Sequence, residues 1–233
     1  MHVSLKPLQE SLGYSFLKRE LLVEALTHPS FKAEHKDILA DNQRLEFLGD
    51  AVVQVLISTY LYEKFETPKE GWLTKVRATL TNQGSLAEFA RHIKLYEYIR
   101  LGKGEILQNA ASRPSTMCDA FEALIGAIYL DSGHKLEIVY DLVISLVEQL
   151  KPDLQQLLAK SNPKGQLQEV VQKKISLKPE YETISAIGPD HSKTFTVEVS
   201  IDGKVYAQAK ANQVKKAEQL AASLALKKLL EDD

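Results

Sequence analysis

The stretches NQRLEFLGDAVVQVLI (residues 42–57) and MCDAFEALIGAIYL (residues 117–130) each combine an almost continuous apolar helix pattern with two acidic residues. Glu46 and Asp50 are four residues apart, and Asp119 and Glu122 are three apart, so each pair projects from one face of its helix. Few other polar residues surround them, and we therefore expect both helices to be buried. A divalent cation is the simplest way to satisfy four carboxylates in such a setting, because an unpaired buried charge is costly.

Carboxylate and water oxygens are the ligands that Mg²⁺ and Mn²⁺ prefer, so the two acidic pairs predict a site for one of these ions. A solvated acidic stripe is the ordinary alternative for acids at helical spacing. Leu45, Phe47 and Leu48, however, leave little polar face around the first pair. A di-iron carboxylate site would require Glu-x-x-His pairs, and the second pair offers no histidine.

The composition is that of an ordinary globular protein of one or two domains, with 233 residues, 44% hydrophobic and 26% charged. No apolar run approaches the roughly 20 residues needed to span a bilayer, and MHVSLKPLQE at the N-terminus lacks the apolar core of a signal peptide. The single Cys118 cannot form an internal disulfide, and its apolar neighbours indicate a core position. We therefore expect a cytoplasmic protein without a membrane partner.

The charge is unevenly distributed along the chain. The net charge of −2 argues against a protein that coats nucleic acid through bulk positive charge. Residues 161–230 nevertheless contain 11 Lys and Arg against 7 Asp and Glu. This basic excess is compatible with phosphate contacts in the C-terminal part.

The hydrophobic period divides the chain into two parts. Up to about Gln156 the spacing is helical, and KPDLQQLLAKSNPKG (residues 151–165) reads as a linker, which predicts domains at 1–156 and 157–233. A helix from Asn162-Pro163, strands over YETISAI (181–187), TFTVEVSI (194–201) and KVYAQAKA (204–211), and a final helix follow, with a hairpin turn at Asp202-Gly203. The predicted fold class is an all-α domain followed by a small α+β domain of order α-β-β-β-α.

These segments resemble a known family. NQRLEFLGDAV (42–52) and DAFEALIGAIYLD (119–131) resemble the two catalytic helices of bacterial ribonuclease III, with further matches in ALTHPSF (25–31), KVRATL (75–80) and LGKGE (101–105). PKGQLQEVVQ (163–172), GPDHSKTFTVEV (188–199) and KKAEQLAA (215–222) resemble a double-stranded-RNA-binding domain in the same order. The resemblance covers nearly the whole chain.

The resemblance implies a Mg²⁺-dependent endoribonuclease that cleaves double-stranded RNA as a homodimer, with Mn²⁺ able to substitute. Its products would carry 5′-phosphate and 3′-hydroxyl ends with short 3′ overhangs, and its role would lie in rRNA and mRNA processing. By position, Glu46, Asp50, Asp119 and Glu122 would bind the metal, with Asp50 and Glu122 as the catalytic residues. LGKGE lacks the P-loop pattern, so ATP is not implied.

The chain departs from the family at the edge of this site. Gln43 stands where the family usually has a glutamate, which leaves any charge-dependent role of this position, including a second metal, in question. Glu70 matches another acidic family position near the scissile strand. Both are assigned supporting roles.

The resemblance also implies a set of RNA contacts. Contacts with the RNA minor groove are expected from Gln166, Glu169 and His191. Contacts near the substrate backbone are expected from Arg77 and Arg113. Lys215 and Lys216 open the last helix, where cations oppose the helix dipole unless a phosphate binds there. Val214 occupies the place of a usual family lysine, which predicts weaker RNA binding than in relatives with both lysines.

Two other functions remain open from the sequence. A non-cleaving double-stranded-RNA-binding protein could keep the fold, although the presence of all four acids argues against it. A helical Mg²⁺ nucleotide pyrophosphohydrolase uses similar acidic pairs, but the C-terminal RNA-binding unit would then have no purpose.

Overall fold

The computed structural model describes residues 4–66, 68–154, 162–189 and 193–231 of the chain. It divides into two compact units, Met1–Pro152 and Asp153–Asp233. Among the described residues, the regular elements of the first unit are all helices, and those of the second are helices and one three-stranded sheet. The predicted fold class, an all-α domain followed by a small α+β domain, is confirmed.

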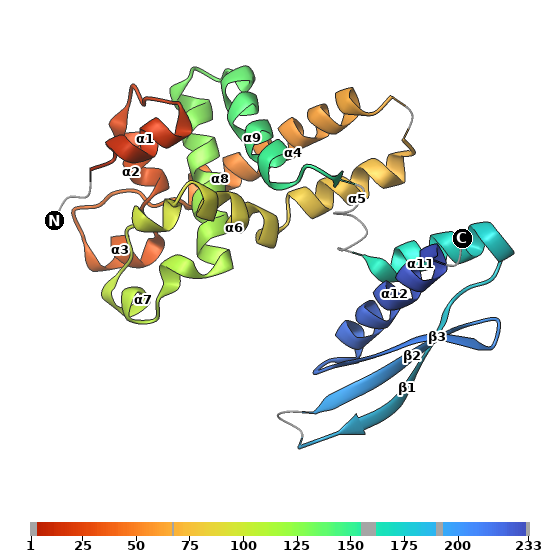
Figure 1. Ribbon diagram of the computed structural model, residues 1–233. Helices are drawn as coiled ribbons and strands as arrows, with labels where there is room; N and C mark the ends of the chain where they lie inside the picture. The colour runs from red at the N-terminus through yellow and green to blue at the C-terminus, as the bar shows by residue number, and fades with distance from the viewer. Residues whose placement is uncertain (1–3, 67, 155–161, 190–192, 232–233) are drawn as a thin grey trace. The chain divides into compact units, whose positions relative to one another are not determined.

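The first unit is built around helix α8, which lies at its centre and packs against α2, α4, α6 and α9 (Figure 1). Its helices are α1 (Lys6–Leu12), α2 (Arg19–Ala25), α3 (Pro29–Glu34), α4 (Gln43–Lys64), α5 (Glu70–Leu80), α6 (Gln83–His92), α7 (Lys103–Leu107), α8 (Pro114–Asp131) and α9 (Leu136–Leu150), with 3₁₀ turns η1 (Leu95–Glu97) and η2 (Ala110–Ser112). Most of α8 is buried, as its apolar sequence predicts.

Two glycines allow α4 and α8 to touch backbone to backbone. A Cβ atom on Gly49 would lie 1.7 Å from the carbonyl oxygen of Glu122, and one on Gly126 would lie 2.4 Å from the carbonyl oxygen of Leu45. Real Cβ atoms do not approach so closely, so only glycine fits at either position. The helices cross where the sequence places the four acids.

The expectation that α4 is a buried helix holds for only one side of it. Its inner side packs in the core through residues such as Leu45, Val53 and Leu56, but Phe47 is 82% exposed and Tyr62 is 79% exposed. By length and composition α4 could cross a membrane, contrary to the expectation that no apolar run is long enough. Because α4 packs along α8, it is a core helix with one solvent-exposed side.

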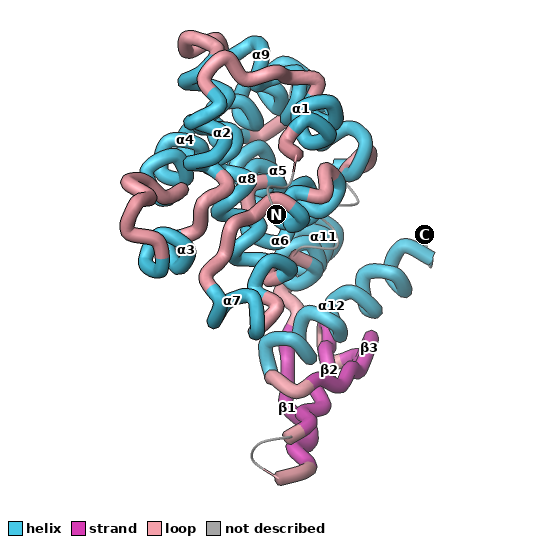
Figure 2. Tube along the Cα trace, turned by 90° about the vertical axis from the view of Figure 1, so that its left-hand side faces the viewer, coloured by secondary structure: helices cyan, strands magenta, loops and turns pink. Residues whose placement is uncertain are grey.

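The second unit has the predicted order α-β-β-β-α: α11 (Pro163–Ile175), β1 (Glu180–Ile187), β2 (Thr194–Ile201), β3 (Lys204–Ala211) and α12 (Val214–Glu231). The strands form an antiparallel sheet of order β1-β2-β3, and Figure 2 shows them side by side. Both helices pack on one face of it, over a core that includes Leu167, Val199 and Ala221. Asp202 and Gly203 have φ angles of 52° and 71°, as the predicted tight hairpin turn requires.

Candidate active site

The crossing of α4 and α8 gathers the four predicted carboxylates into one acidic cluster. Gly49 lies between Glu46 and Asp50 on α4 and meets the backbone of Glu122, which shares α8 with Asp119. Their exposure is graded. Asp50 is exposed, Glu46 and Asp119 are half-buried, and Glu122 is only 9% exposed. The cluster therefore opens to solvent at Asp50 and is closed at Glu122.

Burial raises the pKa of three of these carboxyl groups, and neighbouring negative charges add to the effect at Glu122 and Glu46. Burial raises the pKa of Glu122 to about 7, with further contributions from the charges of Asp50, Glu46 and Asp119. Burial also raises the pKa of Glu46, helped by Asp119 and Asp50, and it raises that of Asp119 against an opposing effect of His28. A raised pKa means that the protonated, uncharged form of each carboxyl group is favoured. Glu122 should therefore be partly protonated near neutral pH when no cation is bound.

The donor atoms at the buried end lie close enough to share an ion. Cys118 Sγ and one carboxylate oxygen each of Asp119 and Glu122 lie within 4.8 Å of one another. Cys118 is buried, as predicted, and its thiol donates a hydrogen bond to Glu122 Oε1 over 3.8 Å. Burial raises the pKa of this thiol, so it is protonated at neutral pH. Glu46 and Asp50 do not belong to this group of donor atoms, although both carboxylates lie near enough for their charges to raise the pKa of Glu122.

Two residues beside the cluster were not predicted from the sequence. Gln54 Nε2 donates to Asp50 Oδ1 over 3.5 Å and to Thr81 Oγ1 over 3.2 Å, which ties the exposed carboxylate to the end of α5. His28 precedes α3, and its Nδ1 accepts a hydrogen bond from the backbone N–H of Ser30. The four-residue spacing from Asp50 to Gln54 was a signal for the first contact. The hydrogen bond of His28 is also local, but its proximity to Asp119 depends on the tertiary fold.

The two supporting residues begin helices. Gln43 is the first residue of α4, and its backbone N–H donates to Asp41 Oδ1 over 3.2 Å. Glu70 is the first residue of α5 and accepts a hydrogen bond from the Thr74 hydroxyl over 2.8 Å. Both are exposed, and neither belongs to the group of donor atoms within 4.8 Å.

The two arginines expected near the substrate backbone are engaged within the first unit. Arg77 donates to Ser58 Oγ over 3.0 Å. Arg113 forms a 2.9 Å ion pair with Glu105 and donates to Gln108 Oε1 over 2.6 Å. Contact with a phosphate would therefore compete with these existing partners.

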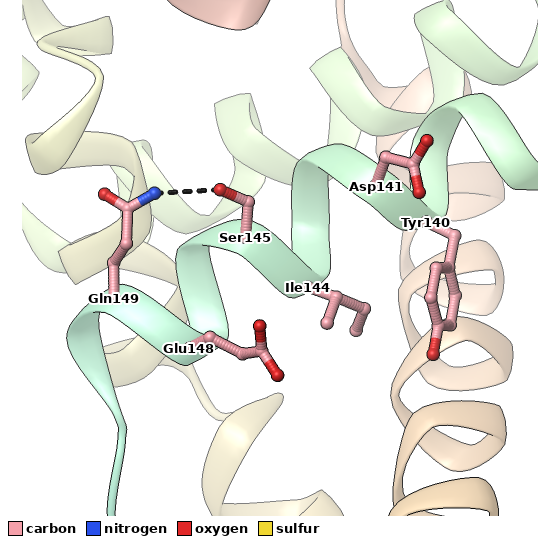
Figure 3. Close-up of a pocket in the computed structure, with 6 residues that line it drawn as sticks. All are labelled: Tyr140, Asp141, Ile144, Ser145, Glu148 and Gln149. Atoms are coloured by element: carbon pink, nitrogen blue, oxygen red, sulfur yellow. Dashed lines mark hydrogen bonds between the residues drawn. The ribbon is translucent and has the colours of Figure 1, made fainter.

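A hollow of about 420 Å³ on α9 shares no residue with the acidic cluster. Figure 3 shows Gln149 donating to Ser145 along its rim, and Glu148 beside them. Glu148 Oε1 in turn lies 3.4 Å from Lys64 Nζ.

The second unit presents its predicted RNA contacts on two helices. Lys215 and Lys216 are exposed in the first turn of α12, while on α11 Glu169 is exposed and Gln166 is half-buried. His191 lies outside the described residues. The clearest omission of the sequence prediction here is Lys164, whose side chain links α11 to α12.

Comparisons with known proteins agree with this architecture. Residues 18–143 match a family described as ribonuclease-III-like, and residues 163–229 match the double-stranded RNA binding motif. The chain is 40% identical to the protein named Ribonuclease 3 of Campylobacter jejuni over 226 residues, covering 97% of this chain and 98% of that protein. It is also 40% identical to Ribonuclease 3 of Listeria monocytogenes over 227 residues, covering 96% of each.

A solved structure supports the same assignment for the first unit. The nuclease domain of Campylobacter jejuni ribonuclease III matches with a TM-score of 0.60 and 39% identity, covering 64% of this chain and 100% of that domain. The molecule thus combines a helical nuclease-type domain with an RNA-binding motif. The chain belongs to the ribonuclease III family, whose members are endoribonucleases.

Proposed function

We propose that this protein is a divalent-metal-dependent endoribonuclease that hydrolyses phosphodiester bonds of double-stranded RNA. The observation that carries the proposal is the acidic cluster at the crossing of α4 and α8, where Glu122 is buried among three other acids and its pKa is raised to about 7. Mg²⁺ is the expected ion, and Mn²⁺ is expected to replace it because both prefer oxygen donors.

Glu46, Asp50, Asp119 and Glu122 would hold the cation, which when bound supplies a Lewis acid and an ionisable water at neutral pH. Glu122 must lose its proton to act as a ligand, so metal binding and proton release are linked. Asp50, at the open end, lies where a phosphate of the substrate can approach. The products would carry 5′-phosphate and 3′-hydroxyl ends with short 3′ overhangs.

The second unit would hold the duplex. Lys215 and Lys216 stand exposed at the start of α12, where the helix N-terminus and both ammonium groups attract the same phosphate. Gln166, Glu169 and His191 are assigned to the shallow minor groove, which is read by shape and 2′-hydroxyl contacts. Arg77 and Arg113 would contact the backbone near the cut after leaving their present partners.

We infer that the protein acts as a homodimer. Phe47 is 82% exposed on α4 and borders a hollow of about 680 Å³. The hollow is lined also by the apolar Leu21, Leu45, Leu48 and Leu130 and by the polar Glu24, Gln43 and Arg44. An exposed aromatic ring beside a hollow with an apolar part suits a twofold contact in which each copy contributes both surfaces. The related Campylobacter jejuni structure concerns flexibility in a region involved in dimer formation of that nuclease domain.

The proposed cellular location follows from the family and from the single cysteine. A ribonuclease III family protein with one buried, unpaired cysteine suits the reducing cytoplasm, where precursor rRNA and mRNA duplexes would be its substrates. The proposed reaction is a hydrolysis that needs no ATP and no membrane partner.

The deciding experiment incubates the full chain with a long RNA duplex, with and without Mg²⁺, beside the variant Glu122→Gln. We expect Mg²⁺-dependent cutting by the unmodified chain, and retained binding without cutting by the variant. Full activity of the variant would defeat the role of Glu122. Binding without cutting by the unmodified chain would favour the non-cleaving alternative, and nucleotide hydrolysis without RNA cleavage would favour the pyrophosphohydrolase.

A further inference from the structure

The two helices that carry the RNA contacts are joined at their starting ends by one compact set of interactions. Lys164, the second residue of α11, places its Nζ 2.8 Å from Glu218 Oε2 near the start of α12. The next residue, Gln219, accepts a hydrogen bond over 3.1 Å from the backbone N–H of Lys164. One residue of α11 is therefore held through both its side chain and its backbone.

The backbone contact satisfies a group that the helix itself cannot. The first four N–H groups of an α-helix lack partners within the helix. In α11, Asn162 Oδ1 accepts from the N–H of Gly165 over 3.1 Å, and Gln219 accepts from that of Lys164. α12 thus supplies part of the N-terminal cap of α11, which fixes the position of one helix start against the other.

The side-chain contact is partly shielded from water. The side chains of Lys164 and Glu218 are 36% and 22% exposed, and Lys164 Nζ also lies 4.4 Å from the centre of the Tyr181 ring on β1. Burial, with the charge of Glu218, raises the pKa of Tyr181 to about 12. The lysine is therefore held between a carboxylate and an aromatic face, a stronger restraint than an isolated surface ion pair.

We propose that Glu218 and Gln219 are positioning residues for duplex RNA binding, which rests on the function proposed above. Together with Lys164 they form a clamp that sets the distance between Glu169 on α11 and Lys215 on α12. A duplex presents its minor groove and its phosphates at a fixed spacing, so a binding surface split over two helices gains affinity when that spacing is preset.

The clamp explains a carboxylate in an unfavourable place. Glu218 lies one helical turn from Lys215, where a negative charge repels the RNA backbone. If Glu218 acted through charge alone, the neutral variant Glu218→Gln would bind RNA more tightly. If it acts by holding Lys164, the same variant binds more weakly, so the direction of the change separates the two roles.

The test measures binding of the full chain to a blunt RNA duplex in EDTA, where no cutting is expected, over a range of salt concentrations. We expect Glu218→Gln and Gln219→Ala each to bind about three- to fivefold more weakly, in the range that a half-exposed ion pair or one hydrogen bond supplies. Glu182→Gln is the matched control, because Glu182 is exposed on β1 and pairs with Glu198, on the sheet side away from the helices. It should bind as tightly as the unmodified chain or slightly more tightly.

A second readout reports the geometry directly. Amide hydrogen exchange at Lys164 should accelerate in Gln219→Ala, while the second unit stays folded and its thermal midpoint falls by no more than the roughly 4–8 °C that corresponds to one hydrogen bond of about 1 kcal/mol. Equal or tighter RNA binding by Glu218→Gln would overturn the clamp while leaving the proposed function intact. Failure of the unmodified chain to bind the duplex would overturn the proposed function, and the clamp with it.

Discussion

The variant Glu122→Gln should make the metal-free protein more stable while it destroys activity. Glu122 is 9% exposed, and its pKa of about 7 compares with an ordinary value of 4.5. Because the pKa of Glu122 is higher in the folded chain, the folded chain binds the proton of this group more tightly than the unfolded chain does. The stability from this group is therefore complete below pH 4.5 and is lost as the pH rises through about 7.

The magnitude follows from the same two values. At pH 8 the ionised Glu122 lowers the free energy of unfolding by roughly 3 kcal/mol relative to its protonated form. A glutamine at this position is neutral at every pH, so it avoids this loss of stability. Its buried amide also needs hydrogen-bond partners, which reduces the expected stabilisation. We expect a stabilisation of about 1–3 kcal/mol at pH 8 and less than about 1 kcal/mol at pH 5.

The assay is urea unfolding in EDTA, followed by the fluorescence of Trp72. The chain has one tryptophan, and it lies on α5 with its ring 4.7 Å from that of Phe65, so the signal reports the first unit alone. Asp141→Asn, an exposed acid on α9, is the control and should change stability by no more than about 0.5 kcal/mol. Added Mg²⁺ should stabilise the unmodified chain more than the Glu122 variant. A variant that gains nothing at pH 8, or gains equally at pH 5, would refute the reasoning.

Three further predictions test the crossing, the dimer and the RNA surface. Gly49→Ala forces a Cβ to 1.7 Å from the Glu122 carbonyl oxygen. It should therefore lower the free energy of unfolding in urea by at least about 1–3 kcal/mol and weaken Mn²⁺ binding measured by titration. Gly71→Ala, with open space around it, should do neither. Phe47→Glu should convert the dimer to a folded monomer in analytical ultracentrifugation, and an unchanged mass would contradict the proposed contact. Val214→Lys should tighten duplex binding and steepen its salt dependence by about one phosphate contact, and an unchanged affinity would show that this position does not meet RNA.

Much of the second unit could be predicted because its signals are local. The alternation in residues 194–201 and the Asp202-Gly203 turn define β2, the hairpin and β3, and the structure places both strands at the predicted bounds. The helix at Asn162-Pro163 also begins as predicted, with Asn162 as its cap. Each of these features depends on residues only a few positions apart.

The errors in the first unit have a different origin. α4 is apolar on nearly every side, so its period does not distinguish the side that packs on α8 from the side that carries the exposed Phe47. The hydrophobic pattern also does not predict which of the four acids is most buried, because this depends on how closely α8 approaches Gly49. The link between Lys164 and Glu218 joins residues far apart in sequence, and no periodicity reports such a contact.

The acidic cluster is maintained by the packing around it rather than by its own interactions. In the described structure its acids repel one another, and burial without a bound cation raises the pKa of Glu122, Glu46 and Asp119 alike. The backbone contact at Gly49 and Gly126 and the buried apolar length of α8 hold these charges together. Binding of a cation then relieves a repulsion that folding has already imposed. Metal affinity and metal-free stability should consequently change in opposite directions when Glu122, Glu46 or Asp119 is neutralised.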